Sequence, residues 1–298
     1  MERRTLGQTG MSVSILGFGG AEIGYGRAAQ ATVDRLLGEA LDAGLNVIDT
    51  AECYLTSEAL IGRAVSHRRQ EVYLLTKCGH ASGLPLPDWD PRLLTQSIER
   101  SLQRLRTDYV DVVQLHSCAI DVLRRDGVID ALRRARAAGK TRYLGYSGDG
   151  EAARYAIACG AFDTLQTSIN LADQEAIALT LPLARARGMG VIAKRPLANV
   201  AWRHGTRPDD PYIWAYWERL RRLDYDFLGQ EVSEAVGVAL RFTLSVDGVH
   251  TAIVGSARAG RWRQNAALLA AGPLAREAFE AIRARWQERA GADWHGEE

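Results

Sequence analysis

The strongest constraint on the fold is the alternation, along the chain, of short apolar runs with longer segments of helical periodicity. Such alternation is typical of βα units, in which helices join parallel strands. Eight runs are predicted to be strands: Ile15–Gly19, Asn46–Thr50, Val72–Lys77, Val110–His116, Arg142–Ser147, Thr164–Ser168, Gly190–Lys194 and Thr251–Val254. Eight βα units in 298 residues favour an α/β fold of the closed (β/α)8 TIM barrel type over a doubly wound open sheet. We therefore expect residues 1–298 to form a single domain.

The connections between these strands predict where a site would lie. Arg4–Leu6 and Ser12–Ser14 flank a short turn signal and predict an N-terminal β-hairpin that closes one end of the sheet. Two long loops, Cys78–Asp90 and Leu197–Gln230, leave the carboxyl ends of strands, and active sites lie at that face of a barrel. Between them, Arg92–Arg106 places its leucines on one helical face.

Charge and composition exclude several classes of protein. The 37 basic and 36 acidic residues give a formal charge of +1, which argues against a nucleic-acid binder. The absence of a long apolar run and of an apolar start predicts a cytoplasmic protein with no membrane segment. Four scattered cysteines without a Cys-x-x-Cys pair predict reduced thiols and no metal site.

Lysine is scarce in this chain. Only Lys77, Lys140 and Lys194 are lysines among the 37 basic residues, and the others are arginines. Lysine carries a compact ammonium on a slim stem, whereas arginine is a broad planar fork. A lysine that ends an apolar run is therefore a candidate for a role that arginine cannot fill.

Four polar residues stand at the ends of consecutive predicted strands. Asp49 ends the second strand, Tyr54 lies in the loop beyond it, Lys77 ends the third strand and His116 ends the fourth. Because burying an isolated charge is costly, we expect these ends to converge and Asp49 to pair with Lys77. The alternative is a stabilising ion pair, with Tyr54 and His116 as ordinary partly buried residues.

These segments resemble the aldo-keto reductases over nearly the whole chain. The resemblance rests on Asn46-Val-Ile-Asp-Thr-Ala with Tyr54 and Ser57-Glu58, on Thr76-Lys77, on Asp108-Tyr-Val-Asp-Val-Val-Gln-Leu-His116 and on Gly139-Lys-Thr-Arg-Tyr-Leu-Gly-Tyr-Ser147. It implies a catalytic tetrad of Asp49, Tyr54, Lys77 and His116. It also implies the NADPH-dependent reduction of a small aldehyde or ketone to an alcohol.

The residue types of this tetrad suit that chemistry. A tyrosine with an ordinary pKa of about 10 is a reluctant proton donor, and we expect the Lys77 ammonium to lower the pKa of Tyr54 towards neutrality. Asp49 would hold Lys77 in place. A neutral His116 would hydrogen-bond the substrate oxygen and orient the carbonyl.

A dinucleotide would have to bind without a Rossmann motif, since Gly17-Phe-Gly19 lacks the third glycine. The segment after the last strand leads into a helix, where backbone N–H groups can hold a phosphate. By resemblance, Ser256, Arg261 and Asn265 would grip the 2′-phosphate, with Arg258 as a second contact; the alternative is that these are surface arginines in an arginine-rich chain. The full set of expected cofactor contacts is Gly20, Asp49, Ser147, Gln166, Lys194, Arg195, Pro196, Leu197, Gly255, Ser256, Arg258, Arg261 and Asn265.

The chain departs from the family pattern at three places. Gly148 stands where an asparagine is usual and is followed by Asp149, and Leu55 replaces the glycine that usually follows the tyrosine. Lys194 stands where many relatives have an aromatic residue that stacks on the nicotinamide. The alternative for Lys194 is a strand-end lysine that reaches out to water.

The substrate pocket is predicted from Ala21, Trp89 and Trp202, which would suit an apolar or aryl carbonyl. Trp214 and Trp217 fall in Pro211–Arg222, which has helical character, and are expected to pack. Two other functions stay open from the residues. One is a cofactor-binding sensor or regulatory subunit with little turnover, and the other is an enzyme that works mainly as an alcohol or sugar dehydrogenase.

Three cysteines, Cys53, Cys78 and Cys118, flank the tetrad. We expect them to fill small apolar gaps. The alternatives are a metal site with His116, or a redox role in which the Lys77 ammonium favours a thiolate.

Overall fold

A computed structural model describes residues 1–297 of the chain. Within that range, eight parallel strands close into a barrel in which the last strand pairs with the first. The strands are β3 (Leu16–Gly19), β4 (Val47–Asp49), β5 (Tyr73–Cys78), β6 (Val110–His116), β7 (Thr141–Ser147), β8 (Thr164–Ser168), β9 (Gly190–Lys194) and β10 (Thr251–Gly255). The predicted (β/α)8 barrel is confirmed, and each predicted strand agrees with an observed one to within one residue at either end.

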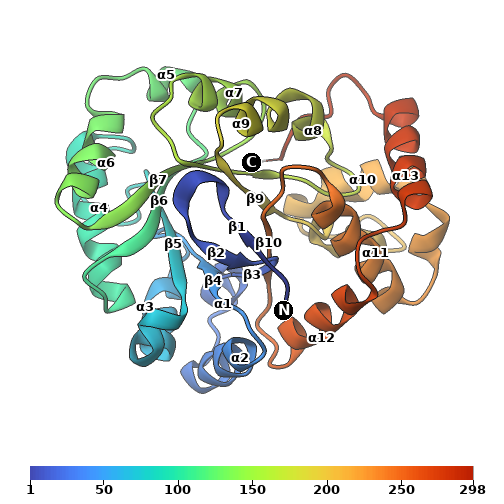
Figure 1. Ribbon diagram of the computed structural model, residues 1–298, viewed down its shortest axis with the longest axis horizontal. Coiled ribbons are helices and arrows are strands. Elements are labelled where there is room, and N and C mark those ends of the chain that lie inside the picture. Colours follow the sequence, from blue (N-terminus) through green and yellow to red (C-terminus); the bar gives the residue numbers. More distant parts are fainter. Residues whose placement is uncertain (298) are drawn as a thin grey trace.

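Helices surround the barrel on all sides (Figure 1). They are α1 (Ala21–Tyr25), α2 (Gln30–Asp42), α3 (Ser57–Val65), α4 (Pro91–Leu105), α5 (Ile120–Leu123), α6 (Val128–Ala137), α7 (Gly150–Ala158), α8 (Glu175–Leu179), α9 (Leu181–Ala186), α10 (Trp214–Leu223), α11 (Val232–Ser245), α12 (Arg261–Leu268) and α13 (Arg276–Arg289). Short 3-10 turns lie at η1 (Gly7–Thr9), η2 (Ser66–Glu71), η3 (Ala198–Arg203), η4 (Pro211–Ile213), η5 (Asp226–Gly229) and η6 (Leu269–Ala271).

Helix α4 shows how the sequence sets these boundaries. Asp90 caps its N-terminus by accepting a hydrogen bond from the Arg92 backbone N–H at 2.7 Å, and Pro91 occupies the first turn. Its leucines and isoleucine are buried along one face, which packs against the barrel. The helix ends at Leu105 because Arg106 adopts a left-handed conformation, with φ of 54°.

The N-terminal hairpin closes the amino-terminal end of the barrel (Figure 1). Its antiparallel strands are β1 (Arg3–Thr5) and β2 (Ser12–Ser14), so the first strand begins and ends one residue earlier than predicted. The turn between them approaches β9 so closely that a Cβ on Gly7 would lie 2.3 Å from the Gly190 nitrogen. A buried apolar cluster joins the hairpin to the barrel strands: Leu6, Met11, Val13, Val47, Leu75, Val112, Ile192 and Ile253.

Both long connections leave the carboxyl-terminal end of the barrel, opposite the hairpin. The first joins β5 to α4, and the second joins β9 to α11 and contains α10. Trp217 packs against the hydrophobic core from α10, and the Trp214 indole N–H donates to the Pro208 carbonyl oxygen at 2.7 Å. The expectation that this segment is helical is confirmed.

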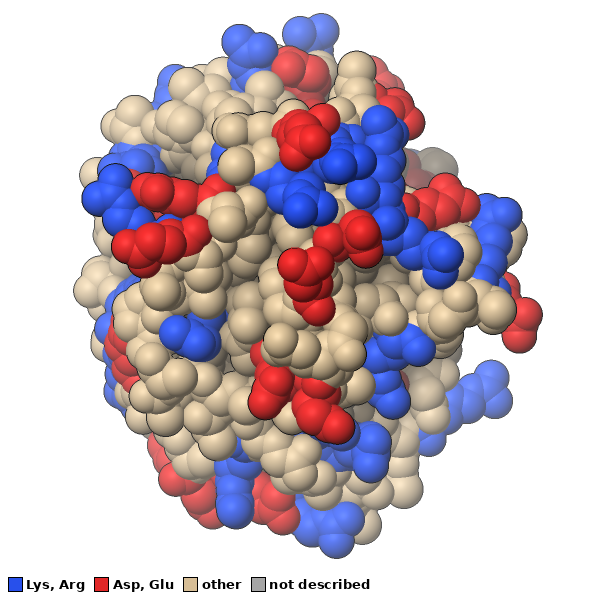
Figure 2. Space-filling model, turned by 90° about the vertical axis from the view of Figure 1, so that its right-hand side faces the viewer, with Lys and Arg blue, Asp and Glu red and all other residues tan. Residues whose placement is uncertain are grey.

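The surface carries mixed charges. On the face shown in Figure 2, acidic and basic side chains are interspersed among other residues. None of the helices in residues 1–297 is both long and apolar enough to cross a membrane.

Candidate active site

Lys77 is the centre of a buried polar cluster at the carboxyl ends of β4 and β5. Its ammonium donates to Asp49 Oδ2 at 2.6 Å, to the Thr50 carbonyl oxygen at 2.9 Å and to Tyr54 Oη at 3.5 Å. The side chains of Lys77 and Asp49 are 1% and 2% exposed. The expected ion pair between these strand ends is therefore present.

Two glutamines complete the surroundings of the Asp49 carboxylate. Gln114 Nε2 and Gln166 Nε2 donate to Asp49 Oδ1 at 3.0 and 2.9 Å. The Ser147 hydroxyl in turn donates to Gln166 Oε1 at 3.1 Å. Ser147 and Gln166, which the sequence predicts to contact the nicotinamide, thus also belong to the network that fixes Asp49.

The tyrosine differs from the sequence-based expectation. Burial raises the pKa of Tyr54 to about 12, although the positive charge of Lys77 acts in the opposite direction. The ammonium acts on this pKa in the expected direction, but the loss of hydration outweighs it, so the net shift is upward and not downward as the sequence predicts. Tyr54 therefore carries its proton at neutral pH.

Lys77 keeps its positive charge in spite of its burial. Burial alone would lower the pKa of the Lys77 ammonium, but the charge of Asp49 and the hydrogen bond to it outweigh that effect, and the pKa is raised. The site therefore holds a permanent cation beside a protonated phenol.

His116 contributes a neutral imidazole, as the sequence predicts. Burial, followed by the positive charge of Lys77, holds the pKa of His116 well below its usual range. Its ring lies edge-on to Tyr54, with centroids 5.6 Å apart and planes at 77°. Its Nδ1 lies 3.4 Å from Cys53 Sγ.

An aromatic wall extends from these rings into the first long loop. His80 lies 5.4 Å from His116 between centroids, and Trp89 lies 5.1 Å from His80. On the other side, Tyr25 lies 5.6 Å from Tyr54. Trp89, predicted to line the substrate pocket, thus belongs to a continuous row of rings. Tyr25 was not identified from the sequence as a residue of the site.

Leu55 shows why a glycine is usual after the tyrosine. It adopts a left-handed conformation with φ of 49° and its side chain is exposed. A leucine in that conformation costs about 1–2 kcal/mol relative to glycine. The loop that positions Tyr54 is therefore strained in this chain.

Lys194 does not reach out to water. Its ammonium lies 2.9 Å from Asp149 Oδ2, and both side chains are nearly buried. Asp149 Oδ1 also accepts from the Thr167 hydroxyl at 2.6 Å and from the Ser168 backbone N–H at 2.7 Å. The residue after Gly148 is therefore the partner of the strand-end lysine, so the alternative of a solvated Lys194 is wrong.

A second buried carboxylate lies near this pair. Asp173 is 1% exposed and accepts hydrogen bonds from the Tyr216 hydroxyl and the Glu297 backbone N–H, both at 3.3 Å. Burial and the negative charge of Asp149 raise the pKa of Asp173 to about 8, although Arg219 acts in the opposite direction. Asp173 is therefore protonated in the folded protein at neutral pH.

Asp173 should make the stability of the protein depend on pH. Between its unfolded pKa of about 4 and its folded pKa of about 8, only the folded state holds the proton, so this group's contribution is complete below pH 4 and lost as pH rises to about 8. The slope should reach about 1.4 kcal/mol per pH unit. Urea unfolding between pH 5 and 8 should show this loss in the wild type and not in Asp173→Asn. Parallel pH profiles for the two proteins would contradict it.

The residues predicted to hold the cofactor lie around β9 and β10. Arg195 donates from Nε to the Tyr212 hydroxyl at 3.0 Å and from Nη1 to the Glu297 carbonyl oxygen. Leu197 is buried in the hydrophobic core, and the Pro196 carbonyl accepts from the Thr243 hydroxyl at 3.4 Å.

After β10, a short loop leads into α12. The Ser256 hydroxyl oxygen accepts from the Arg258 backbone N–H at 3.0 Å, and the Arg258 side chain is exposed. Arg261 is half-buried and Asn265 is 3% exposed, four residues apart on α12. The structure therefore brings these two together on one helical face.

The first turn after β3 lies against both β4 and β10. The Gly20 N–H donates to the Asp49 carbonyl oxygen at 2.8 Å, and Ala21 begins α1 as a half-buried residue. A Cβ on Gly255 would lie 1.6 Å from Glu22 Oε2. Gly20 and Gly255 therefore permit a close approach that larger residues would block.

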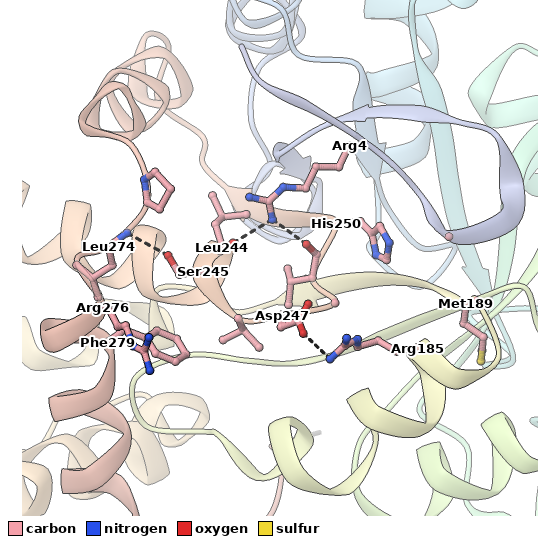
Figure 3. A pocket seen from close by; sticks show the side chains of 16 residues that line it. Arg4, Arg185, Met189, Leu244, Ser245, Asp247, His250, Leu274, Arg276 and Phe279 are labelled. Atoms are coloured by element: carbon pink, nitrogen blue, oxygen red, sulfur yellow. Dashed lines mark hydrogen bonds and ion pairs between the residues drawn. The ribbon is translucent and has the colours of Figure 1, made fainter.

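A separate cavity of about 810 Å³ lies at the opposite end of the barrel, beside the hairpin (Figure 3). Arg4 extends over it and donates to the Leu244 and Val249 carbonyl oxygens at 2.9 and 2.8 Å. Arg185 pairs with Asp247. Since the tetrad does not line this cavity, it is not part of the candidate active site.

The barrel and the four converging residues define an aldo-keto reductase. The model of the aldo/keto reductase family matches residues 15–287, and the chain belongs to this family.

Relatives of known activity agree with this assignment. The chain is 31% identical to an L-galactose dehydrogenase of Arabidopsis thaliana over 213 residues, 66% of each chain. It is 28% identical to an NADH-specific methylglyoxal reductase of Escherichia coli over 220 residues, 66% of this chain and 68% of that one. Among solved structures it is similar to the holo form of an aldo-keto reductase from Bacillus halodurans, with a TM-score of 0.83, 26% identity and 96% of both chains covered. The chain thus spans about two thirds of these two curated relatives.

The residues after β9 fit a nicotinamide dinucleotide. Asn199 Nδ2 and Trp202 Nε1 are buried donors that have no hydrogen-bond partner within residues 1–297. The oxygen-rich phosphates and carboxamide of a dinucleotide offer the acceptors that such donors need. Ala198, Asn199 and Val200 also adopt left-handed conformations, with φ of 43°, 53° and 55°, and strain of this kind clusters at ligand sites.

The cysteines around the tetrad do not form a metal site among the described residues, where no group of three histidine, cysteine or acidic side chains could hold a metal ion. Burial and the negative charge of Glu52 raise the pKa of the Cys53 thiol to about 11, in spite of Lys77. Burial likewise raises the pKa of Cys78. The thiolate on which the redox alternative depends is therefore disfavoured.

Proposed function

We propose that the protein reduces an aldehyde or ketone to an alcohol with NADPH and that Tyr54 donates the proton. The observation that carries this proposal is a protonated phenol whose oxygen lies 3.5 Å from a buried ammonium. When bound, the reduced nicotinamide supplies a hydride to the carbonyl carbon. This chain's residues then supply the proton and orient the carbonyl.

The proposed division of labour follows from the contacts. As the carbonyl oxygen gains negative charge, Tyr54 transfers its proton to it, and the Lys77 ammonium stabilises the phenolate left behind. Asp49, fixed by two glutamines, holds Lys77 in position. The neutral imidazole of His116 donates a hydrogen bond to the same oxygen.

Oxidation of an alcohol or sugar is the second candidate, because one relative is an L-galactose dehydrogenase. Oxidation needs Tyr54 as a phenolate base. The same tetrad would serve both directions, since the proton that Tyr54 gives up in reduction is the one it takes back in oxidation. We propose that the reaction takes place in the cytoplasm, in one domain, on a small carbonyl compound.

Consumption of NADPH and NADH against a panel of aldehydes, ketones and dicarbonyls tests this function, with cofactor binding followed by fluorescence. Turnover of a carbonyl is the expected result. Binding without turnover would favour a sensor instead, and turnover only with alcohols or sugars and the oxidised cofactor would favour a dehydrogenase.

Arg261 is proposed to select NADPH. Arg261→Ala should weaken NADPH binding by about 1.5–3 kcal/mol, the range for a charge-assisted hydrogen bond, with little effect on NADH. Arg263→Ala is the matched control, because Arg263 is exposed on the same helix. Titration by fluorescence measures both affinities, and equal losses for NADPH and NADH would refute the phosphate role.

A further inference from the structure

Cys53 lies directly before the proposed proton donor and contacts the other group that would face the substrate oxygen. Its sulfur is 3.4 Å from His116 Nδ1. Within residues 1–297, the His116 ring has this one hydrogen-bond contact with a side chain. The tetrad residue that would orient the carbonyl is therefore itself oriented by a thiol.

The proton states of the two groups decide the direction of this contact. His116 is neutral, so one ring nitrogen carries a proton and the other accepts. The Cys53 thiol is protonated, since burial raises its pKa to about 11. An imidazole nitrogen is a good acceptor and a thiol sulfur a weak one, so the favourable direction runs from S–H to Nδ1.

We infer that Cys53 is a positioning residue that holds His116 in the tautomer with the proton on Nε2. In that tautomer Nε2 is the only ring nitrogen that can donate to a substrate oxygen. The effect of this tautomer on catalysis rests on the proposed function. The tautomer itself can be measured without turnover.

Nitrogen-15 NMR of histidine-labelled protein tests the tautomer directly. The chain has six histidines, and the His116 signals are assigned from the His116→Asn spectrum. In the wild type at neutral pH we expect a protonated, pyrrole-type Nε2 and a bare, pyridine-type Nδ1. A pyrrole-type Nδ1 would overturn the inference.

Variants at position 53 separate the hydrogen bond from the packing. Cys53→Ala should move both nitrogen shifts towards their average and lower kcat about 2- to 12-fold, the range for one lost hydrogen bond, with an unchanged Kd for NADPH. Cys53→Ser should keep the tautomer and restore kcat, because its hydroxyl can donate as the thiol does. Cys159→Ala is the control, since Cys159 is exposed at the end of α7 and should change neither quantity.

The two hypotheses fail in different ways. If Cys53→Ala keeps the wild-type tautomer, the inference is wrong, whatever the protein reduces. If the tautomer responds as expected but no carbonyl is turned over, the proposed function is wrong and the role of Cys53 on His116 stands.

Discussion

Tyr54→Phe should lower the rate of carbonyl reduction by about 10²- to 10⁴-fold, the range for a lost general acid, and leave cofactor affinity nearly unchanged. The phenyl ring keeps the contacts with Tyr25 and His116, at 5.6 Å between centroids in each case, but has no proton to give. Single-turnover reduction with bound NADPH measures the chemical step without product release.

The control for this variant is Tyr109→Phe, which removes a hydroxyl directly before β6, at the opposite end of the barrel. It should leave the rate unchanged. Wild-type turnover in Tyr54→Phe would remove the tyrosine from its proposed role. A large loss in both variants would point to damage to the fold.

Lys77→Met should be the most damaging substitution for stability and activity together. It removes the ammonium 2.6 Å from Asp49 and leaves a carboxylate that is 2% exposed without its cation. Breaking a buried pair in this way costs about 3–5 kcal/mol of unfolding free energy. The Tyr54 phenolate would also lose its stabilising charge, so reduction should slow by orders of magnitude. Urea unfolding and single-turnover rates measure the two effects.

Two further variants separate charge balance from catalysis. Asp49→Asn combined with Lys77→Met removes both charges and should recover part of the lost stability without recovering activity. Lys77→Arg keeps the charge in a broader group that cannot reproduce the ammonium's three contacts, and should stay impaired. Full activity in Lys77→Arg would show that only the charge matters at this position.

The barrel could be predicted because most of its strands are short, largely apolar runs that must be buried, separated by segments of helical periodicity. The convergence of Asp49 and Lys77 followed from the same reasoning, since neighbouring parallel strands end at the same face. Gln114 was missed, although it carried a signal: it alternates with Val112 and His116 along β6 and therefore faces the barrel interior with them.

Other features of the site could not be predicted from the chain because they depend on balances of energy. The pKa of Tyr54 depends on how far the upward effect of burial exceeds the downward effect of the Lys77 charge, and a sequence does not give that difference. The pairing of Lys194 with Asp149 depends on the register of β9 against the loop after β7. The position of Trp89 beside His80 depends on left-handed residues in a loop without regular structure.

The hairpin across the amino-terminal end has a consequence for how a proton would return to Tyr54. Leu6, Met11 and Val13 cover that end of the barrel with buried apolar side chains. On the proposed function, a proton given up by Tyr54 would be replaced from solvent at the opposite, carboxyl-terminal face, where substrate and cofactor would also enter. The return of a proton to Tyr54 would then be coupled to the departure of the alcohol, and a slowly leaving product would keep Tyr54 deprotonated.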